Sequence, residues 1–169
     1  MTADIRLGLI GDNILASQSP RLHRLAGSQN GVRVTYDRLI PARMQMPFDA
    51  LFAHVAESGY RAVNVTYPYK ERAAAKVTVD DPLVRAIGAV NTVIFDAGGP
   101  HGFNTDHSGF ILAYRWVRGE QPPGPVLMIG AGGVGKAIAF GLVALGLTEI
   151  RIADRDLPKA QALADALRA

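Results

Sequence analysis

The sequence predicts an α/β fold of two lobes, each built around a mostly parallel sheet. Short apolar segments typical of buried strands alternate along the chain with longer segments that have a helical pattern. Such alternation favours parallel sheets with right-handed crossovers. One stretch, residues 119–125 (GEQPPGP), interrupts it. Because proline suits the interior of neither helix nor sheet, we predict a first domain over 1–118, a linker over 119–125 and a second domain over 126–169.

In the first lobe, turn and cap signals bound each predicted element. Residues 6–11 (RLGLIG) form a short apolar run that ends in glycine, which is typical of a buried strand. Ser19 and Pro20 predict a helix start, because serine is a good N-cap and proline is preferred at the first helical position. This helix is expected to end near Asn30 and Gly31. The other predicted elements are strands over 32–39, 61–65, 91–95 and 101–103, and helices over 47–57, 71–76, 82–87 and 107–117.

The second lobe is predicted to contain strands over 126–129 and 149–153 and helices over 134–145 and 157–167. Between the first strand and helix, Gly130, Gly132 and Gly135 have the G-x-G-x-x-G spacing. These glycines allow a tight turn, close approach of the backbone to a pyrophosphate, and close packing of helix on strand. The strand before the loop and the helix after it are the context that a Rossmann dinucleotide site requires.

An acidic residue and a competing motif bear on this interpretation. Asp154 lies 19 positions after Gly135, where a carboxylate can accept hydrogen bonds from ribose hydroxyls. The same glycines nearly match a phosphate-binding P-loop, but position 137 is alanine, so the hydroxyl that binds Mg²⁺ is missing. We therefore favour a dinucleotide site. Its predicted residues are Gly130, Ala131, Gly132, Gly133, Val134, Gly135, Asp154 and Arg155.

Polar residues gather in four segments of the first lobe where a plain core would not require them. These segments are SQSP at 17–20 with a following histidine, NVTYPYK at 64–70, GAVNT at 88–92 and GFNTD at 102–106. Asn64 and Asn91 interrupt apolar runs, although an unpaired amide is costly to bury. Hydroxyls, amides and one ammonium together suit a small carboxylate that carries several hydroxyl groups.

The ordered motifs S-x-S-P, N-V-T-x-P-x-K, G-A-V-N-T, G-x-N-T-D and G-A-G-G resemble the shikimate dehydrogenase family, which includes the quinate/shikimate dehydrogenases. The resemblance extends from Leu7 to the last predicted helix. It implies a substrate-binding domain followed by the first part of a Rossmann domain that binds NAD(P). Family members continue past the position of Ala169, so the resemblance also implies that this chain stops within the Rossmann domain.

The family transfers a hydride reversibly between NAD(P) and the C3 ring hydroxyl of shikimate, or the equivalent carbon of quinate. By the resemblance, Lys70 and Asp106 form the catalytic pair. Negative charge grows on the ketone oxygen as hydride arrives, and the lysine can both stabilise that charge and supply a proton. The aspartate would orient the lysine and the reacting hydroxyl. The implied substrate contacts are Ser17, Ser19, Asn64, Thr66, Lys70, Asn91 and Asp106, with the serines on the carboxylate.

Plainer interpretations of single residues remain open beside these roles. Ser19 could act as a helix cap as well as a ligand, and Asp106 could be the N-cap of the helix predicted over 107–117. Lys70 alone would most often be a solvated surface lysine. Tyr67 and Tyr69 could line the site or pack in the core. The histidines show no metal-ligand spacing, so no metal is expected.

The choice of cofactor depends on residues 152–156 (IADRD). Family members that use NADP commonly have Asn-Arg-Thr here, with the arginine on the 2′-phosphate. Two carboxylates, Asp154 and Asp156, would repel that phosphate, whereas Asp154 suits a free ribose diol. We therefore expect NAD, with NADP as the alternative.

Composition excludes several other classes. The chain has 169 residues, no cysteine and a formal net charge of +3, and its basic residues form no dense run of the kind that nucleic-acid binding requires. No apolar run reaches the roughly 20 residues that span a bilayer. We expect a cytoplasmic monomer or homodimer with a small-molecule substrate, and no nucleic-acid or membrane partner. Three functions remain open: shikimate dehydrogenase, NAD-dependent quinate/shikimate dehydrogenase, and a ligand-binding fragment without catalysis.

Overall fold

The computed structural model describes residues Ala3 to Arg168 and divides them into two compact units. The first unit contains the described residues up to Asp80 together with Val90–Phe103, and the second contains Asp81–Ala89 and the residues from Asn104 onward. Each unit combines helices with a sheet, so the predicted α/β class is confirmed. No helix in the described part of the chain is long and apolar enough to cross a membrane.

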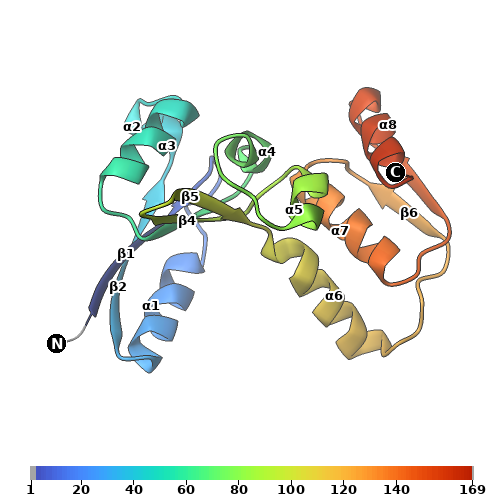
Figure 1. Cartoon of the computed structure of the whole chain (residues 1–169), viewed down its shortest axis with the longest axis horizontal. Coiled ribbons are helices and arrows are strands. Elements are labelled where there is room, and N and C mark those ends of the chain that lie inside the picture. Colours follow the sequence, from blue (N-terminus) through green and yellow to red (C-terminus); the bar gives the residue numbers. More distant parts are fainter. Residues whose placement is uncertain (1–2, 169) are drawn as a thin grey trace. The chain divides into compact units, whose positions relative to one another are not determined.

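The first unit is built on a mixed five-stranded sheet in the order β2-β1-β3-β4-β5 (Figure 1). Its parallel part pairs β1 with both β2 and β3, and its antiparallel part is the hairpin of β4 and β5 joined to β3. The strands are β1 (Ala3–Ile10), β2 (Val32–Leu39), β3 (Ala62–Val65), β4 (Thr92–Asp96) and β5 (Gly99–Phe103). The hairpin is the antiparallel addition to an otherwise parallel arrangement.

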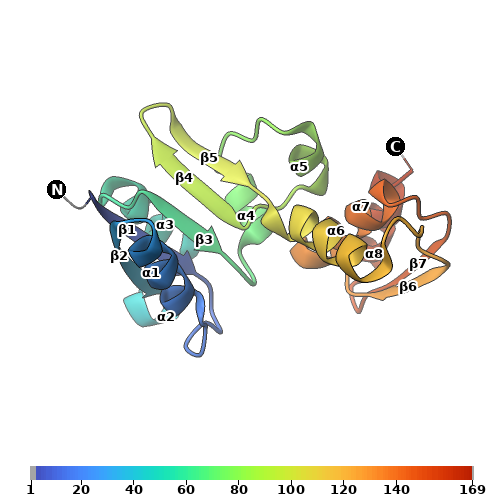
Figure 2. The same ribbon diagram turned by 90° about the horizontal axis from the view of Figure 1, so that it is seen from below.

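Helices α1 (Ser19–Gln29) and α3 (Phe48–Glu57) connect the parallel strands and lie on opposite faces of the sheet (Figures 1 and 2). This follows from topology, because the chain passes from β1 out to β2 and then back across β1 to β3. Two short helices, α2 (Pro41–Met44) and α4 (Lys70–Ala74), complete the unit. On α3, the buried side chains of Phe48, Leu51, Phe52 and Val55 supply much of the core.

In the second unit, the parallel strands β6 (Val126–Ile129) and β7 (Ile150–Ala153) are joined through helix α7 (Gly133–Ala144). Helices α5 (Pro82–Ile87), α6 (Thr105–Arg118) and α8 (Leu157–Ala166) complete it. Met128, Leu142 and Leu163 form a core between the sheet and helices α7 and α8. Figure 2 labels these elements from another side. The arrangement is the strand–loop–helix–strand unit that the glycine spacing predicts.

Helix α6 belongs to the second compact unit, although the sequence placed residues 105–118 before the linker. A Cβ added at Gly141 of α7 would lie 2.9 Å from the Phe110 ring of α6, so the two helices are in close contact. The last boundary between the two compact units therefore lies between Phe103 and Asn104, and residues 119–125 lie inside the second unit. The assignment of substrate binding to 1–118 and of dinucleotide binding to 126–169 concerns ligands, and it stays a prediction.

The structure corrects the N-cap predicted at Ser19, excludes the cap role considered for Asp106, and adds one helix that was not predicted. Ser19 is the first residue of α1 and its hydroxyl does not cap the helix, because Gln18 occupies the N-cap position. Helix α6 begins at Thr105 and its N-cap is Asn104, whose side chain accepts from two backbone N–H groups; Asp106 is therefore not the cap. Helix α2 was not predicted, because a single turn has no detectable periodicity.

Candidate active site

The carboxyl ends of β1 and β3 place the first group of predicted site residues. Because these strands are parallel neighbours, the segments that follow Ile10 and Val65 leave the sheet at the same edge. The backbone N–H of Thr66 donates to the Ile10 carbonyl at 2.9 Å. A Cβ added at Gly11 would lie 2.4 Å from the methyl carbon of Thr66. The loop after β1 is thus packed directly on Thr66.

Ser17 and Ser19 face each other at the start of α1. The Ser17 hydroxyl donates to the Ser19 hydroxyl at 3.1 Å, and the backbone N–H of Ser19 donates to Oγ of Ser17 at 3.2 Å. The Arg38 guanidinium donates to the Ser17 carbonyl at 2.8 Å. Two hydroxyls held this close, on a fixed backbone, can both donate to one carboxylate.

A row of hydrogen bonds runs from Ser19 through Tyr36 and Asn64 to Thr92, and we call it the polar row. Tyr36 donates to Oδ1 of Asn64 at 2.8 Å and also shares a side-chain hydrogen bond with Ser19. Nδ2 of Asn64 donates to the Thr92 hydroxyl at 3.2 Å. The row explains how the sheet accepts the amide of Asn64, since both of its ends are paired. It connects α1 with strands β2, β3 and β4.

Tyr36 lies within the candidate site, and the sequence analysis did not predict it there. Its ring is buried, and its hydroxyl joins two of the predicted substrate contacts, Ser19 and Asn64. Burial raises the pKa of Tyr36 to about 12, and the hydrogen bond with Ser19 opposes part of that rise. The phenol is therefore neutral at physiological pH and acts as a hydrogen-bond partner. His23 packs beside it, with ring centroids 4.7 Å apart.

Lys70 and Asn91 are each held in the first unit by backbone hydrogen bonds. Lys70 is the first residue of α4 and only 9% of it is exposed, so it is not the solvated surface lysine that its type alone suggests. Its carbonyl accepts from the Val90 N–H at 3.1 Å. The Asn91 carbonyl accepts from the Val65 N–H at 2.8 Å, and its side-chain oxygen accepts from Thr92 at 3.1 Å.

The loop between Thr66 and Lys70 is anchored by an aromatic residue. Tyr69 donates its hydroxyl to Oδ1 of Asp12 at 2.7 Å and stacks on Phe48 with ring centroids 4.7 Å apart. Burial, followed by the hydrogen bond to Asp12, raises the pKa of Tyr69. Tyr67, by contrast, is largely exposed. Of these two tyrosines, Tyr69 therefore has the packing role.

Asp106 lies in the second unit, as the second residue of α6. Its backbone N–H donates to Oδ1 of Asn104 at 3.0 Å, and that same oxygen accepts from His107. The buried Asn104 also donates Nδ2 to the Ala89 carbonyl at 2.9 Å. Because Asn104 caps the helix, the Asp106 carboxylate is not needed to start it. Lys70 belongs to the other unit, so their catalytic pairing stays a prediction.

The glycine loop has the local geometry that its spacing predicts. Gly130 follows β6 with φ +104°, a conformation that side chains disfavour. A Cβ at Gly135 would lie 2.2 Å from the Gly130 carbonyl oxygen, so helix and turn are in contact there. Gly132 is the N-cap of α7, and a Cβ there would meet nothing within 4 Å. The backbone is therefore closely packed between Gly130 and Gly135, whereas the space beside Gly132 is open.

Asp154 lies at the carboxyl end of β7, and its carboxylate holds the glycine loop. Oδ2 accepts from the Ala131 N–H at 2.7 Å and Oδ1 accepts from the Asp156 N–H at 2.9 Å. The hydrogen bond from Ala131, followed by that from Asp156, lowers the pKa of Asp154. A negative charge is thus fixed beside the loop, and each oxygen still has acceptor capacity. The neighbouring Arg155 is exposed.

Two family models match the chain: the shikimate dehydrogenase substrate binding domain over residues 9–93, and shikimate / quinate 5-dehydrogenase over residues 121–169. The chain belongs to the shikimate dehydrogenase family. A member from Corynebacterium efficiens, the quinate/shikimate dehydrogenase (NAD(+)), is 34% identical over 167 residues, which cover 96% of this chain and 59% of that protein.

Solved structures of the shikimate dehydrogenase family agree with the fold. Quinate dehydrogenase from Corynebacterium glutamicum in complex with NAD matches with a TM-score of 0.86 at 34% identity, over 98% of this chain and 60% of that one. Shikimate 5-dehydrogenase from Thermus thermophilus, in complex with NADP(H) and shikimate, matches with a TM-score of 0.80 at 35% identity, over 97% and 61%. The chain thus spans about 60% of the length of these relatives.

Proposed function

We propose that this chain carries the substrate site and the ADP-binding half of an enzyme that interconverts shikimate and 3-dehydroshikimate with a nicotinamide dinucleotide. The supporting observation is the polar row, which gathers Ser19, Asn64 and Thr92 in the compact unit that also contains the buried Lys70. Relatives named as shikimate and quinate/shikimate dehydrogenases support the same chemistry. Serines at both 17 and 19 favour shikimate over quinate as the substrate.

Each substrate contact has a physical reason. Ser17 and Ser19, with their hydroxyl oxygens 3.1 Å apart, would turn from each other to donate to the substrate carboxylate. Asn64 and Thr66 would lie along the ring of the substrate, and Asn91 and Asp106 would form hydrogen bonds with its hydroxyl groups. Tyr36 would position Ser19 and Asn64 from behind.

Lys70 would supply the electrostatic stabilisation and the proton at the C3 oxygen, and would take the proton back in the oxidation direction. Its burial strengthens this role, because an ammonium acts more strongly on a neighbouring charge when water is excluded. Asp106 would orient the lysine and the reacting hydroxyl.

The residues of the second unit fit a dinucleotide. The positive φ of Gly130 and the open space at Gly132 leave room for a pyrophosphate at the N-terminus of α7, where backbone N–H groups have no partner within the helix. Asp154 would accept from the adenosine ribose. When bound, NAD(P) supplies or accepts the hydride. Ala137, buried against Ile87 and Ala89, offers no hydroxyl for the Mg²⁺ of a P-loop.

Among the two cofactors, the fixed charge of Asp154 favours NAD. Its lowered pKa keeps the carboxylate ionised, and that charge repels a 2′-phosphate. Calorimetric titration with 5′-AMP and with adenosine 2′,5′-bisphosphate tests this choice, because the two probes differ only in the 2′-phosphate. We expect 5′-AMP to bind more tightly, and tighter binding of the bisphosphate would contradict the proposal.

The substrate assignment is tested by calorimetry with shikimate and quinate on the chain and on two serine variants. Ser17→Ala should weaken shikimate binding roughly 10- to 150-fold, because a hydrogen bond to a charged group contributes about 1.5–3 kcal/mol. Ser28→Ala, at an exposed serine near the other end of α1, is the matched control and should have no effect. Equal affinities for the two variants would refute the carboxylate site.

Catalysis is tested by following nicotinamide absorbance with shikimate, quinate and both cofactors. Lys70→Met should lower turnover by roughly 10²- to 10⁴-fold, the usual contribution of a general acid. Asp106→Asn should lower turnover while retaining the helix, because Asn104 provides the cap. If the unmodified chain binds shikimate without turnover, the alternative of a ligand-binding fragment is favoured. Efficient turnover of quinate with NAD would favour the quinate/shikimate alternative.

Partners and location follow from the same proposal. We infer that the partner of the site is a small molecule and that no nucleic acid or membrane takes part. The expectations of a cytoplasmic protein and of a monomer or homodimer stay predictions.

A further inference from the structure

The two serines proposed to hold the substrate carboxylate carry no charge. Ser17 and Ser19 are neutral donors, and in the proposed function Lys70 acts at the C3 oxygen. A carboxylate that leaves water for hydroxyl donors alone loses part of its hydration, and an opposite charge nearby offsets that loss. A cation close to the two serines would therefore strengthen the binding of an acid and would leave the binding of an uncharged analogue unchanged.

Arg38 lies at the carboxyl edge of the sheet, beside the loop that carries the serines. It is the last residue but one of β2, and parallel pairing places it opposite Leu9, close to the end of β1. The loop over residues 11–18 leaves β1 at this edge and leads into α1. One guanidinium nitrogen of Arg38 donates to the Ser17 carbonyl at 2.8 Å. The side chain therefore extends from β2 to the segment that contains the proposed carboxylate site.

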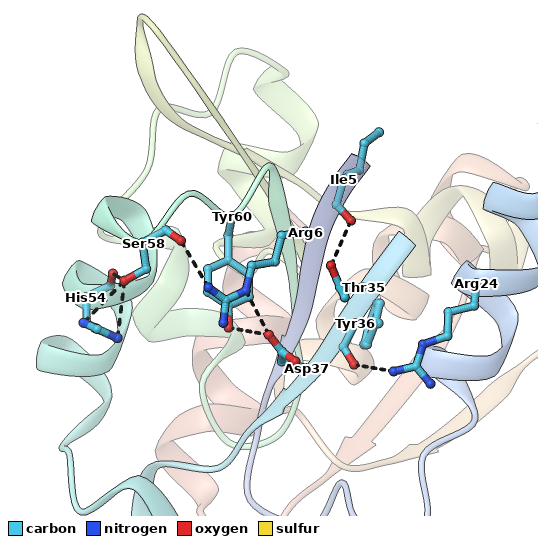
Figure 3. A network of polar contacts seen from close by, with 9 residues as sticks. All are labelled: Ile5, Arg6, Arg24, Thr35, Tyr36, Asp37, His54, Ser58 and Tyr60. Atoms are coloured by element: carbon cyan, nitrogen blue, oxygen red, sulfur yellow. Dashed lines mark hydrogen bonds and ion pairs between the residues drawn. The ribbon is translucent and has the colours of Figure 1, made fainter. Parts of the chain in front are cut away.

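The face of β2 that carries Arg38 is also the face of the polar row. Side chains alternate along a strand, so Tyr36 and Arg38 share one face and Asp37 lies on the other. On the first face, the Tyr36 hydroxyl belongs to the polar row. On the opposite face, the Asp37 carboxylate accepts from Arg6 and Tyr60, as Figure 3 shows. The acidic neighbour of Arg38 is thus engaged on the far side of the sheet.

The guanidinium of Arg38 has no carboxylate partner among residues 3–168. Other arginines of the first unit form ion pairs with aspartates: Arg6, Arg33 and Arg72. The acidic residue of the loop after β1, Asp12, accepts instead from Tyr69. Arg38 is exposed, and its hydrogen bond to an uncharged carbonyl leaves further N–H donors of the guanidinium for a ligand.

We propose that Arg38 supplies the positive charge for the substrate carboxylate and makes the site selective for acids over uncharged analogues. This inference rests on the proposed function, because it requires the carboxylate to lie at Ser17 and Ser19. A serine hydroxyl lies within about 4–5 Å of the carbonyl oxygen of the same residue, so the bonded nitrogen of Arg38 lies within about 7 Å of the Ser17 hydroxyl.

The size of the effect follows from this separation. Coulomb's law at about 7 Å corresponds to roughly threefold in affinity in bulk water and to roughly 50-fold at an effective dielectric constant of about 20. Because Arg38 is exposed, water and salt screen much of the interaction. We therefore expect Arg38 to contribute about 3- to 10-fold to the affinity for an acid.

Calorimetry with shikimate and with its uncharged methyl ester separates the charge of Arg38 from its hydrogen bond to Ser17. In Arg38→Gln the charge is lost, although the side-chain amide still has N–H donors. This variant should bind shikimate about 3- to 10-fold more weakly than wild type and should bind the ester equally well. Arg38→Lys keeps the charge and should bind shikimate to within about threefold of wild type. Equal losses for acid and ester would overturn the proposal, because a residue that only holds the loop affects both ligands alike.

The matched control is Arg33→Gln, which makes the same change in net charge on the same strand. Arg33 lies near the other end of β2, about 17 Å from Arg38 along the strand, and pairs with Asp4. Since exposed charges this far apart are largely screened, its affinity for shikimate should change less than about twofold. Circular dichroism checks that each variant is folded. A loss in Arg33→Gln as large as that in Arg38→Gln would refute a local role for Arg38.

Salt dependence is a second measurement, and it begins with the unmodified chain. Raising the ionic strength from about 0.02 M to about 0.5 M should weaken the binding of shikimate but not that of the ester. The same change should affect Arg38→Gln less than wild type, and equal salt dependence of the two would overturn the proposal. If wild type binds neither ligand, the proposed function fails and this inference fails with it. If Ser17→Ala weakens shikimate binding and Arg38→Gln does not, the carboxylate site stands and only the role of Arg38 is refuted.

Discussion

Replacing Gly11 by alanine should destabilise the first unit and disturb the substrate site. The added Cβ would lie 2.4 Å from Cγ2 of Thr66 and 2.9 Å from Cγ2 of Ile14. Carbon atoms prefer a separation of about 3.5–4.0 Å, so Thr66 or the loop must move by about 1 Å. Overpacking of this kind costs about 1–3 kcal/mol. Since the Thr66 N–H bonds to the Ile10 carbonyl, movement also strains the end of β3.

The assay is thermal and urea unfolding followed by circular dichroism, combined with shikimate calorimetry. A loss of about 2 kcal/mol corresponds to a fall in Tm of roughly 10 °C for a unit of this size. The matched control is Gly109→Ala. Gly109 lies inside α6, and a Cβ there meets nothing within 4 Å. That variant should be more stable by about 0.5–1 kcal/mol, because alanine is the better helix former.

The opposite signs make the comparison decisive. If Gly11→Ala were as stable as wild type and bound shikimate normally, the close packing of the first loop on Thr66 would not constrain the site. If Gly109→Ala were less stable, the reasoning from helix propensity and open space would fail.

The remaining predictions concern the polar side chains of Tyr36, Asp154 and Asn104, each of which has hydrogen-bond partners within its own unit. Tyr36→Phe should cost about 1–3 kcal/mol in urea unfolding, because Asn64 loses a buried partner. Burial raises the pKa of Tyr36 to about 12, so wild type should lose stability as pH rises from about 10 through 12, and Tyr36→Phe should lose less. The pKa of Asp154 is lowered from 3.8, so its contribution to the free energy of unfolding is present above that pH and is lost as the pH falls below it. An acid titration of the stability of Asp154→Asn should lack this loss. Asn104→Ala should cost about 1–2 kcal/mol through the lost cap, and an unchanged melting curve would contradict the assignment.

Most helices and strands could be predicted because residues near their ends, such as proline and glycine, mark their boundaries locally. Strands β2 and β6 and helix α5 begin and end at the residues predicted, and the others differ by a few residues. The proline at the start of α5 and the glycine after it are local signals that do not depend on the rest of the fold. Likewise, the glycine loop could be located because each glycine meets a backbone requirement.

The caps and the polar row depended on contacts that a local pattern does not contain. In the segment Asn104-Thr-Asp106 both end residues are good caps, and the choice follows from the bond between Asn104 and Ala89, 15 residues away. The local sequence predicts only that Tyr36 lies in a strand, because its hydrogen-bond partner Asn64 is 28 positions later in the chain. A usable signal was present, since a core-facing tyrosine and a core-facing asparagine in one sheet each require a partner.

The division of the chain also bears on how this protein can be taken apart. The polypeptide passes between the compact units at three places, after Asp80, Ala89 and Phe103. Segment 81–89 contributes Ile87 and Ala89 to a core completed by Ala137, about fifty positions further on. A chain shortened at the proline-rich stretch would expose that apolar cluster to water. Dissection should therefore begin with a graft that replaces segment 81–89 by a polar loop, leaving the five-stranded sheet as one soluble piece.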